Sequence, residues 1–411
     1  MGIGESEHVC LSGLPEVTSA VSWLSRAEFG WVDFGPGLGS NDGTHVSGSP
    51  PMRSFVLVAI TLSPAVAQDA AVQWLDARKL TVEGQGWKET KAPFDRLPAK
   101  AEGSVRPAVW SLSQHSAGIC VRFQSDATEI HAKWKLRSAK LEMPHMPSTG
   151  VSGLDLYARD TKGKWRWVAN GRPSKQDNQS KLVSGLSAQM REYMLYFPLY
   201  NGVTSVEVGV PAAAKLEPGQ PRAAGASKPI VFYGTSITQG GCASRPGMVH
   251  TAILGRWLDC SVINLGFSGN GRMESEIGQL MAEIDASVYV IDCLPNISAA
   301  QVTERTFGLV QELRKARPRV PIVLVEDRNY TDSVFVTSKA RRNQSSQKAL
   351  EAEFEKLKSA GIGNLLYVRG EDLLGDDGEG TVDSSHPTDL GFMRQAEAFH
   401  EVLKPLVGSK D

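Results

Sequence analysis

The spacing of apolar residues changes near residue 211, and this change constrains the fold more than any other feature of the chain. Before it, apolar and polar residues alternate, as at positions 119–123, 130–134 and 206–210. Alternation with a period of two is typical of half-buried β-strands. After it, short apolar runs alternate with segments of helical period. The sequence therefore predicts two domains of different class.

Residues 72–212 are expected to form an all-β sandwich or jelly-roll domain. Turn-forming clusters at 161–164 and 200–202 separate the strand-like runs, and long helical patterns are scarce. Residues 213–228 are rich in Ala, Pro and Gly. That composition predicts an exposed linker between two folded units.

Residues 229–407 are expected to form an α/β domain with a parallel sheet covered on both faces. Strands are predicted at 230–233, 262–265, 288–292, 322–326 and 365–368, and helices at 302–316, 347–359 and 389–403. Ligands of such sheets bind beyond the carboxyl ends of the strands, so the residues that follow each strand are the candidates for chemistry.

The first 67 residues have a different character. Residues 1–51 are rich in Gly and Ser and lack periodicity, which predicts a disordered or non-native leader. Residues 52–67 combine a positive start at Met52–Arg53, an apolar run and a small-residue cleavage site. This pattern predicts a signal peptide, translation from Met52, and a secreted or periplasmic protein with no membrane span after cleavage. A buried apolar segment and an uncleaved anchor are the alternatives.

Charge and cysteine content narrow the functional classes. The 411-residue chain has a net charge of −1, so no basic excess favours nucleic acid or an anionic membrane as partner. Cys10 lies in the leader and Cys120 in a strand-like run, while Cys242, Cys260 and Cys293 could form one bridge or remain buried free thiols. The sequence contains no Cys-x-x-Cys spacing, so the cysteines do not indicate a zinc site.

Two segments carry the residues of a nucleophilic serine site. Ser236 follows the first predicted strand of the α/β domain, where its hydroxyl would lie at the sheet's carboxyl edge. Asp383 precedes His386 by three residues, so its carboxylate can fold back on Nδ1 and leave Nε2 to take the serine proton. The alternatives are a turn serine, a helix-capping Asp383 with a surface histidine, and a metal pair that includes Asp389.

Two further loops offer donors for an oxyanion. Gly269 follows the second strand in a loop of small residues, where a backbone amide can approach a ligand. Asn296 follows the third strand and carries a side-chain amide. With the amide of Ser236, these groups would form an oxyanion hole. A turn glycine, and a turn or helix-capping asparagine, are the alternatives.

The order of these blocks resembles the SGNH, or GDSL-type, hydrolases. Gly234-Thr235-Ser236-Ile237, Gly269, Asn296 and Asp383-x-x-His386 match its four blocks over residues 229–406. The resemblance implies a flavodoxin-like three-layer fold. The sequence departs from the family at Thr235, where many members carry Asp, and at 294–296, where many have Gly-x-Asn-Asp.

The first domain carries a shorter resemblance. Residues 153–157, Gly-Leu-Asp-Leu-Tyr, resemble an element of the β-sandwich domains that precede certain bacterial SGNH esterases. Such a sandwich could cover part of the active-site mouth, with His145, Tyr157 or Tyr200 at the substrate entrance. Core packing or surface turns are the alternative for each residue.

Together these resemblances imply a serine esterase that works through an acyl-enzyme, without metal or organic cofactor. A small-molecule or carbohydrate ester is the expected substrate, and deacetylation of carbohydrate is one form of that hypothesis. The alternatives are an acyltransferase with the same triad and a non-catalytic carbohydrate-binding protein.

Overall fold

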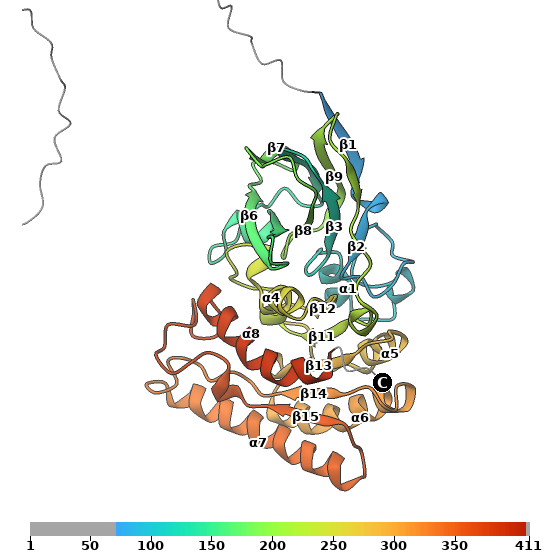
Figure 1. The fold of residues 1–411 in the computed structure, drawn as a ribbon. Helices are drawn as coiled ribbons and strands as arrows, with labels where there is room; N and C mark the ends of the chain where they lie inside the picture. The colour runs from blue at the N-terminus through green and yellow to red at the C-terminus, as the bar shows by residue number, and fades with distance from the viewer. Residues whose placement is uncertain (1–70, 408–411) are drawn as a thin grey trace, which may run out of the picture. The chain divides into compact units, whose positions relative to one another are not determined.

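The computed structural model describes residues 71–407, and all of them fall within one compact unit (Figure 1). The leader predicted at 1–51, the signal peptide predicted at 52–67 and Cys10 lie outside the described residues. Within 71–407, no helix is long and apolar enough to cross a membrane.

The first half is a sandwich of two antiparallel sheets around an apolar core. One sheet has the order β1 (Val72–Asp76), β9 (Val203–Pro211), β4 (Glu129–Leu136) and β7 (Asp177–Ser184). The other has the order β10 (Leu216–Pro218), β3 (Cys120–Ser125), β8 (Arg191–Tyr196), β5 (Leu154–Arg159) and β6 (Trp165–Gly171), with β2 (Thr81–Glu83) also paired to β3. The helices α1 (Pro107–Ser113) and α2 (Ser148–Val151) lie in the connections. The predicted antiparallel sandwich is confirmed.

The second half is a five-stranded parallel sheet between two layers of helices. Its order is β12 (Val262–Gly266), β11 (Ile230–Gly234), β13 (Val288–Asp292), β14 (Ile322–Val325) and β15 (Leu365–Val368). The helices are α3 (Ser236–Gln239), α4 (His250–Trp257), α5 (Ser275–Glu283), α6 (Ala299–Ala316), α7 (Thr337–Ser359) and α8 (Asp389–Leu403). The strand order 2-1-3-4-5 is that of flavodoxin-like folds, as predicted.

Two apolar clusters cover the faces of this sheet. Side chains of α5, α6 and α7 pack on one face, and those of α4 and α8 pack on the other. The second cluster also contains Tyr157, Met194 and Tyr196 of the sandwich. Strand β5 is therefore buried on both faces from Leu154 to Ala158, whereas its sequence period alone would predict a half-buried strand.

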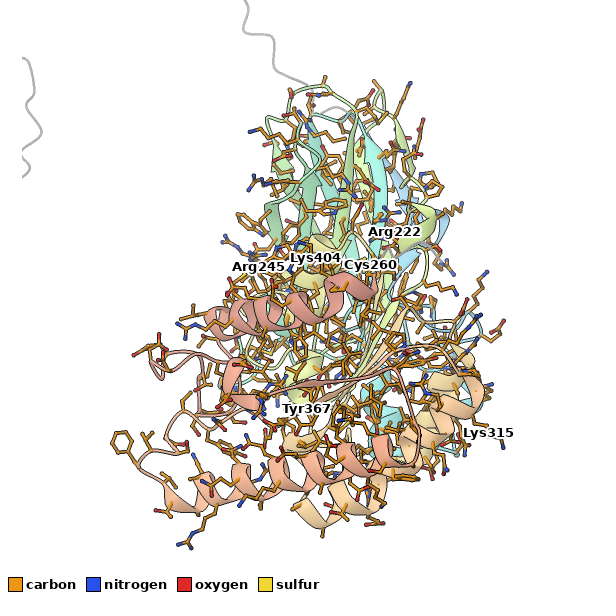
Figure 2. All side chains as sticks on the ribbon, turned by 60° about the horizontal axis from the view of Figure 1, so that its bottom comes forward. Arg222, Arg245, Cys260, Lys315, Tyr367 and Lys404 are labelled. Carbon is orange, nitrogen blue, oxygen red and sulfur yellow. The ribbon has the colours of Figure 1, made fainter. Side chains whose placement is uncertain are left out.

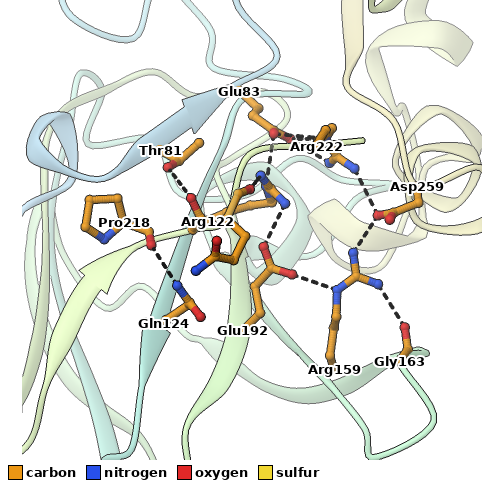
Figure 3. Close-up of polar contacts among 12 residues, drawn as sticks. Thr81, Glu83, Arg122, Gln124, Arg159, Gly163, Glu192, Pro218, Arg222 and Asp259 are labelled. Carbon is orange, nitrogen blue, oxygen red and sulfur yellow. Dashed lines mark hydrogen bonds and ion pairs between the residues drawn. The ribbon is translucent and has the colours of Figure 1, made fainter. Parts of the chain in front are cut away.

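The structure corrects two of the predicted boundaries. Residues 213–228 are not all linker, because β10 pairs with β3 and Arg222 joins an ion-pair network that also contains Arg122 and Glu83 (Figure 3). Pro218 is tolerated in β10 because this is an edge strand. Helix α7 begins ten residues before its predicted start, since residues 337–346 are mostly polar and show no apolar period.

Candidate active site

Ser236 lies on a sharp turn between β11 and α3. Strand β11 ends at Gly234, and the hydroxyl of Thr235 accepts a hydrogen bond from the amide of Ile237 at 3.2 Å, which caps α3. A side chain at position 234 would lie 2.0 Å from Thr238 Oγ1, so only glycine fits there. Ser236 is thus the first helical residue, buried at the carboxyl edge of the sheet.

Ser236, His386 and Asp383 form a continuous line of hydrogen bonds. Ser236 Oγ is 2.8 Å from His386 Nε2, and His386 Nδ1 is 2.8 Å from Asp383 Oδ2. The other oxygen of Asp383 accepts the amides of Ser385 at 3.1 Å and of His386 at 2.8 Å. The structure therefore brings together three residues that the sequence separates by up to 150 positions.

Asp383 is held in its charged form. Partial burial raises the pKa of its carboxyl. Hydrogen bonds from the backbone amide and the imidazole of His386 lower this pKa by a larger amount, so the net effect is a lowered pKa. A carboxylate facing Nδ1 favours the tautomer with its proton on Nδ1. Nε2 is then free to accept the proton of the Ser236 hydroxyl.

The predicted oxyanion donors lie at the ends of three adjacent strands. Ser236, Gly269 and Asn296 follow β11, β12 and β13, which pair in parallel and end at the same sheet edge. Gly269 adopts a φ of +66°. Within residues 71–407, the amides of Ser236 and Gly269 have no protein acceptor. Both donors thus remain available to a ligand.

Asn296 packs beside the loop that carries Gly269. Its Nδ2 donates hydrogen bonds to the carbonyl oxygen of Phe267 at 3.4 Å and to that of Gly271 at 3.3 Å. Asn296 does not cap the following helix, because Ser298 caps α6 in a capping box with Gln301. The helix-capping alternative for Asn296 is therefore wrong.

The alternatives for Asp383 and His386 are wrong on similar grounds. Thr388 caps α8 through a hydrogen bond from the amide of Gly391, so Asp383 is not its cap. Asp389 accepts hydrogen bonds from the amide of Ser244 at 2.9 Å and from its hydroxyl at 2.5 Å, so it does not pair with His386. Among residues 71–407, no group of three or more His, Cys, Asp or Glu residues could hold a metal ion.

The described cysteines are free and buried: Cys120, Cys242, Cys260 and Cys293. This confirms the free-thiol prediction and leaves no bridge among the last three. Burial raises the pKa of Cys260 to about 12, which keeps its thiol protonated and unreactive at neutral pH.

Of the three residues expected at the entrance, the structure places two near the triad. The hydroxyl of Tyr200 donates to the carbonyl oxygen of Ser236 at 3.1 Å. His145 is exposed, and its ring centroid lies 6.1 Å from that of His386, which fits a position at the entrance. Tyr157 is instead buried against Arg245 and Arg256, so core packing is the correct alternative for this residue.

A buried ion pair near Ser236 was not predicted. Arg328, which follows β14, binds both oxygens of Asp292, one of them at 2.7 Å. Asp292 also accepts a hydrogen bond from Thr238 Oγ1 at 3.0 Å, which ties the pair to α3. The available signal was a carboxylate at the end of an apolar strand, because a buried charge requires a partner.

Two arginines from the sandwich half hold the end of β12 and the loop that follows it. Arg96 is fully buried, and its Nη1 donates to the carbonyl oxygens of Asn264 at 3.0 Å and Gly266 at 2.7 Å. Arg106 donates to the side chain and the carbonyl oxygen of Asn270, both at 2.8 Å. Neither contact was predicted, because nothing in the local sequence indicates a partner more than 160 residues away.

Comparison with known proteins assigns both halves. Residues 227–404 match the GDSL-like lipase/acylhydrolase family, and residues 72–216 match the GxDLY family, the N-terminus of SGNH-hydrolase-type esterases. A search of curated proteins found no match.

Solved structures with both domains are similar over most of the chain. A protein from Bacteroides ovatus described as a GDSL-like lipase is 33% identical, with a TM-score of 0.77, covering 82% of this chain and 98% of its own. A salicylyl-acyltransferase from a tetracycline biosynthetic pathway is 18% identical, with a TM-score of 0.62, and the match covers 82% of this chain and 97% of the acyltransferase. An acetyl xylan esterase from Butyrivibrio proteoclasticus is 10% identical, with a TM-score of 0.51, and the match covers 81% of this chain and 98% of the esterase.

Proposed function

Because the chain belongs to the GDSL-like lipase/acylhydrolase (SGNH) family, with a GxDLY N-terminal domain, we propose that it is a serine esterase. Ser236 is its nucleophile, His386 its general base and Asp383 the residue that orients the base. The observation that carries this proposal is the line of two 2.8 Å hydrogen bonds that links the three side chains.

The reaction begins when Ser236 Oγ attacks the acyl carbonyl and its proton passes to His386 Nε2. The amides of Ser236 and Gly269 and the side chain of Asn296 stabilise the negative oxygen, each such donor contributing about 3 kcal/mol. His386 then protonates the leaving alcohol, and an acyl-enzyme forms. Water activated by His386 releases the acid, so the cycle balances with substrate and water alone.

The test is Ser236→Ala with p-nitrophenyl acetate as substrate. Release of p-nitrophenol should fall to background, because no other group occupies the nucleophile position. Ser275→Ala, which changes an exposed serine at the start of α5, is the matched control and should retain wild-type activity. A fluorophosphonate should label the wild type and the control but not Ser236→Ala.

Undiminished turnover by Ser236→Ala would remove this residue from the mechanism. Failure of the fluorophosphonate to label the wild type would favour the other candidate class, a non-catalytic carbohydrate-binding protein.

The proposed substrate is an acetylated carbohydrate. Two observations support it, the near-neutral chain and the acetyl xylan esterase with the same fold. The export signal predicted at residues 52–67 is consistent with it. The enzyme is accordingly proposed to be secreted or periplasmic. Acetate release from acetylated xylan should exceed hydrolysis of medium-chain acyl esters, and the reverse preference would contradict this substrate class.

Acyl transfer is the second candidate reaction, because a salicylyl-acyltransferase shares the fold. Solvent access favours hydrolysis: the side chains of His386 and Asp383 are 26% and 44% exposed, so water can reach the base. Product analysis with an added alcohol acceptor separates the two reactions. A new ester formed in preference to free acid would identify a transferase.

A further inference from the structure

The loop that carries Asp383 and His386 has a tight and unusual backbone. The amide of Val382 donates to the carbonyl oxygen of His386 at 2.8 Å, so the residues between them form a narrow turn. Ser384 in this turn adopts a φ of +73°, in the left-handed region that disfavours residues with a side chain. Such a conformation is unfavourable for a residue with a side chain, so its surroundings must hold it.

A neighbouring segment provides that support. The carbonyl oxygen of Ser384 accepts the amide of Thr331 at 3.1 Å, and the Thr331 hydroxyl lies 3.0 Å from that of Thr381. The hydroxyl of Ser384 accepts a hydrogen bond from Lys339 Nζ at 2.6 Å. Ser384 is therefore held at both its backbone and its side chain.

Lys339 is itself fixed in place. It lies in the first turn of α7, and its Nζ is 2.5 Å from Asp332 Oδ2. The Nζ also lies 5.4 Å from the ring centroid of Tyr330. Two oxygen acceptors and an aromatic face restrict the position of the ammonium group. Helix α7 thus anchors the turn.

We propose that Lys339 is a positioning residue of the catalytic loop, holding Ser384 left-handed so that Asp383 and His386 face Ser236. The inference rests on the proposed serine esterase mechanism. Lys339 contacts Ser384 and Asp332, so it acts through the loop. Because a small displacement of a base strongly reduces its efficiency, loss of this contact lowers kcat.

The first test is Lys339→Met, assayed with p-nitrophenyl acetate. We expect kcat to fall about tenfold with KM within about twofold, because the change misplaces the base without removing a substrate contact. Lys339→Arg should retain most activity, since a guanidinium can bridge the same two oxygens. Lys356→Met is the matched control: it removes another lysine of α7, which contacts Glu353 and the ring of Phe307, and it should not change kcat.

The second test separates positioning from a general effect on folding. Glycine adopts a positive φ without the cost that a side chain brings. In a Ser384→Gly background, Lys339→Met should therefore cause no more than a twofold further loss of kcat. Thermal unfolding of each variant checks that the fold is intact. If Lys339→Met does not fold, Ser384→Ala removes the same hydrogen bond from the other side and should lower kcat in the same way.

Two outcomes would overturn the inference: wild-type kcat in Lys339→Met, or an undiminished effect of that change in the Ser384→Gly background. Either result would leave the esterase proposal intact provided that Ser236→Ala is inactive. Full activity of Ser236→Ala would instead refute the mechanism itself.

Discussion

Ser236 depends on its neighbours for reactivity. A serine hydroxyl is a weak nucleophile at neutral pH and needs an adjacent base. Here His386 Nε2 lies at 2.8 Å, and the hydroxyl of Tyr200 donates to the carbonyl oxygen of the serine itself at 3.1 Å. In the proposed mechanism, the first contact supplies the base, and the second fixes the backbone that carries Ser236.

Asn296 permits a prediction at the level of a single donor. Asn296→Ala should lower kcat for p-nitrophenyl acetate about 100-fold or more with little change in KM, because an oxyanion donor acts mainly in the transition state. Steady-state kinetics provide the measurement. Asn296→Asp lacks the donor but keeps the shape of the side chain, so it should resemble the alanine variant. A change confined to KM would instead show that Asn296 binds substrate.

At the level of elements, the nucleophile turn and the loop after β12 pack backbone against backbone. A side chain at Gly271 would lie 1.8 Å from the carbonyl oxygen of Gly234, and one at Gly266 would lie 2.1 Å from the amide nitrogen of Gln239. Arg106 holds the same loop from the sandwich side, through Asn270. The position of the Gly269 amide is therefore set by close contact on one side and by a cross-domain arginine on the other.

Gly271→Ala should consequently abolish most esterase activity and lower the melting temperature, because the added methyl group displaces the loop from Gly234. Gly308→Ala is the matched control. A side chain at Gly308 in α6 meets nothing within 4 Å, and replacing a helical glycine with alanine should stabilise the protein by about 1 kcal/mol. Activity assays and thermal unfolding test both variants, and an active, stable Gly271→Ala would contradict the packing argument.

At the scale of the whole molecule, polar contacts join the sandwich to the α/β domain. Buried Asp155, within the Gly-Leu-Asp-Leu-Tyr element, accepts hydrogen bonds from Arg245 Nη1 and from the amide of Gly247, both at 2.8 Å. Figure 2 shows Arg245, Arg222 and Cys260 near the level where the two halves meet. Because these contacts reach the segment that follows α3, the sandwich forms part of the framework of the site.

The same junction predicts a dependence of stability on pH. Burial, with the nearby charges of Arg96 and Arg137, lowers the pKa of His115 to about 4. The unfolded chain binds a proton on this histidine below about pH 6.5 but the folded chain does not, so stability is lost as pH falls from about 6.5 to 4. The full loss is about 3 kcal/mol.

Chemical unfolding of the wild type and of His115→Gln across this pH range measures the effect. The glutamine can still accept the hydrogen bond that Gln239 Nε2 donates to His115 Nδ1, so the fold should be retained. The variant should lose less stability than the wild type between pH 6.5 and 4. Equal slopes for the two proteins would show that His115 does not contribute.

Local pattern predicted most of the elements and the candidate site. The change from alternating to helical period predicted the sandwich and the parallel sheet, because each period reflects which face of a strand or helix is buried. The positions after β11, β12 and β13 predicted the candidate site, because parallel strands end at one edge. The start of α7 and the strand β10 were missed, since polar helices and short edge strands have little periodic signal.

The sequence by itself thus determined the class of each domain and the residue types placed at the sheet edge, because both follow from spacing along the chain. Tertiary structure alone decided which distant groups support them: Arg106 on Asn270, Arg328 on Asp292, and Lys339 on Ser384. These pairs have no sequence period. Each depends on how far two elements approach after packing, a distance set by the side chains of the whole core.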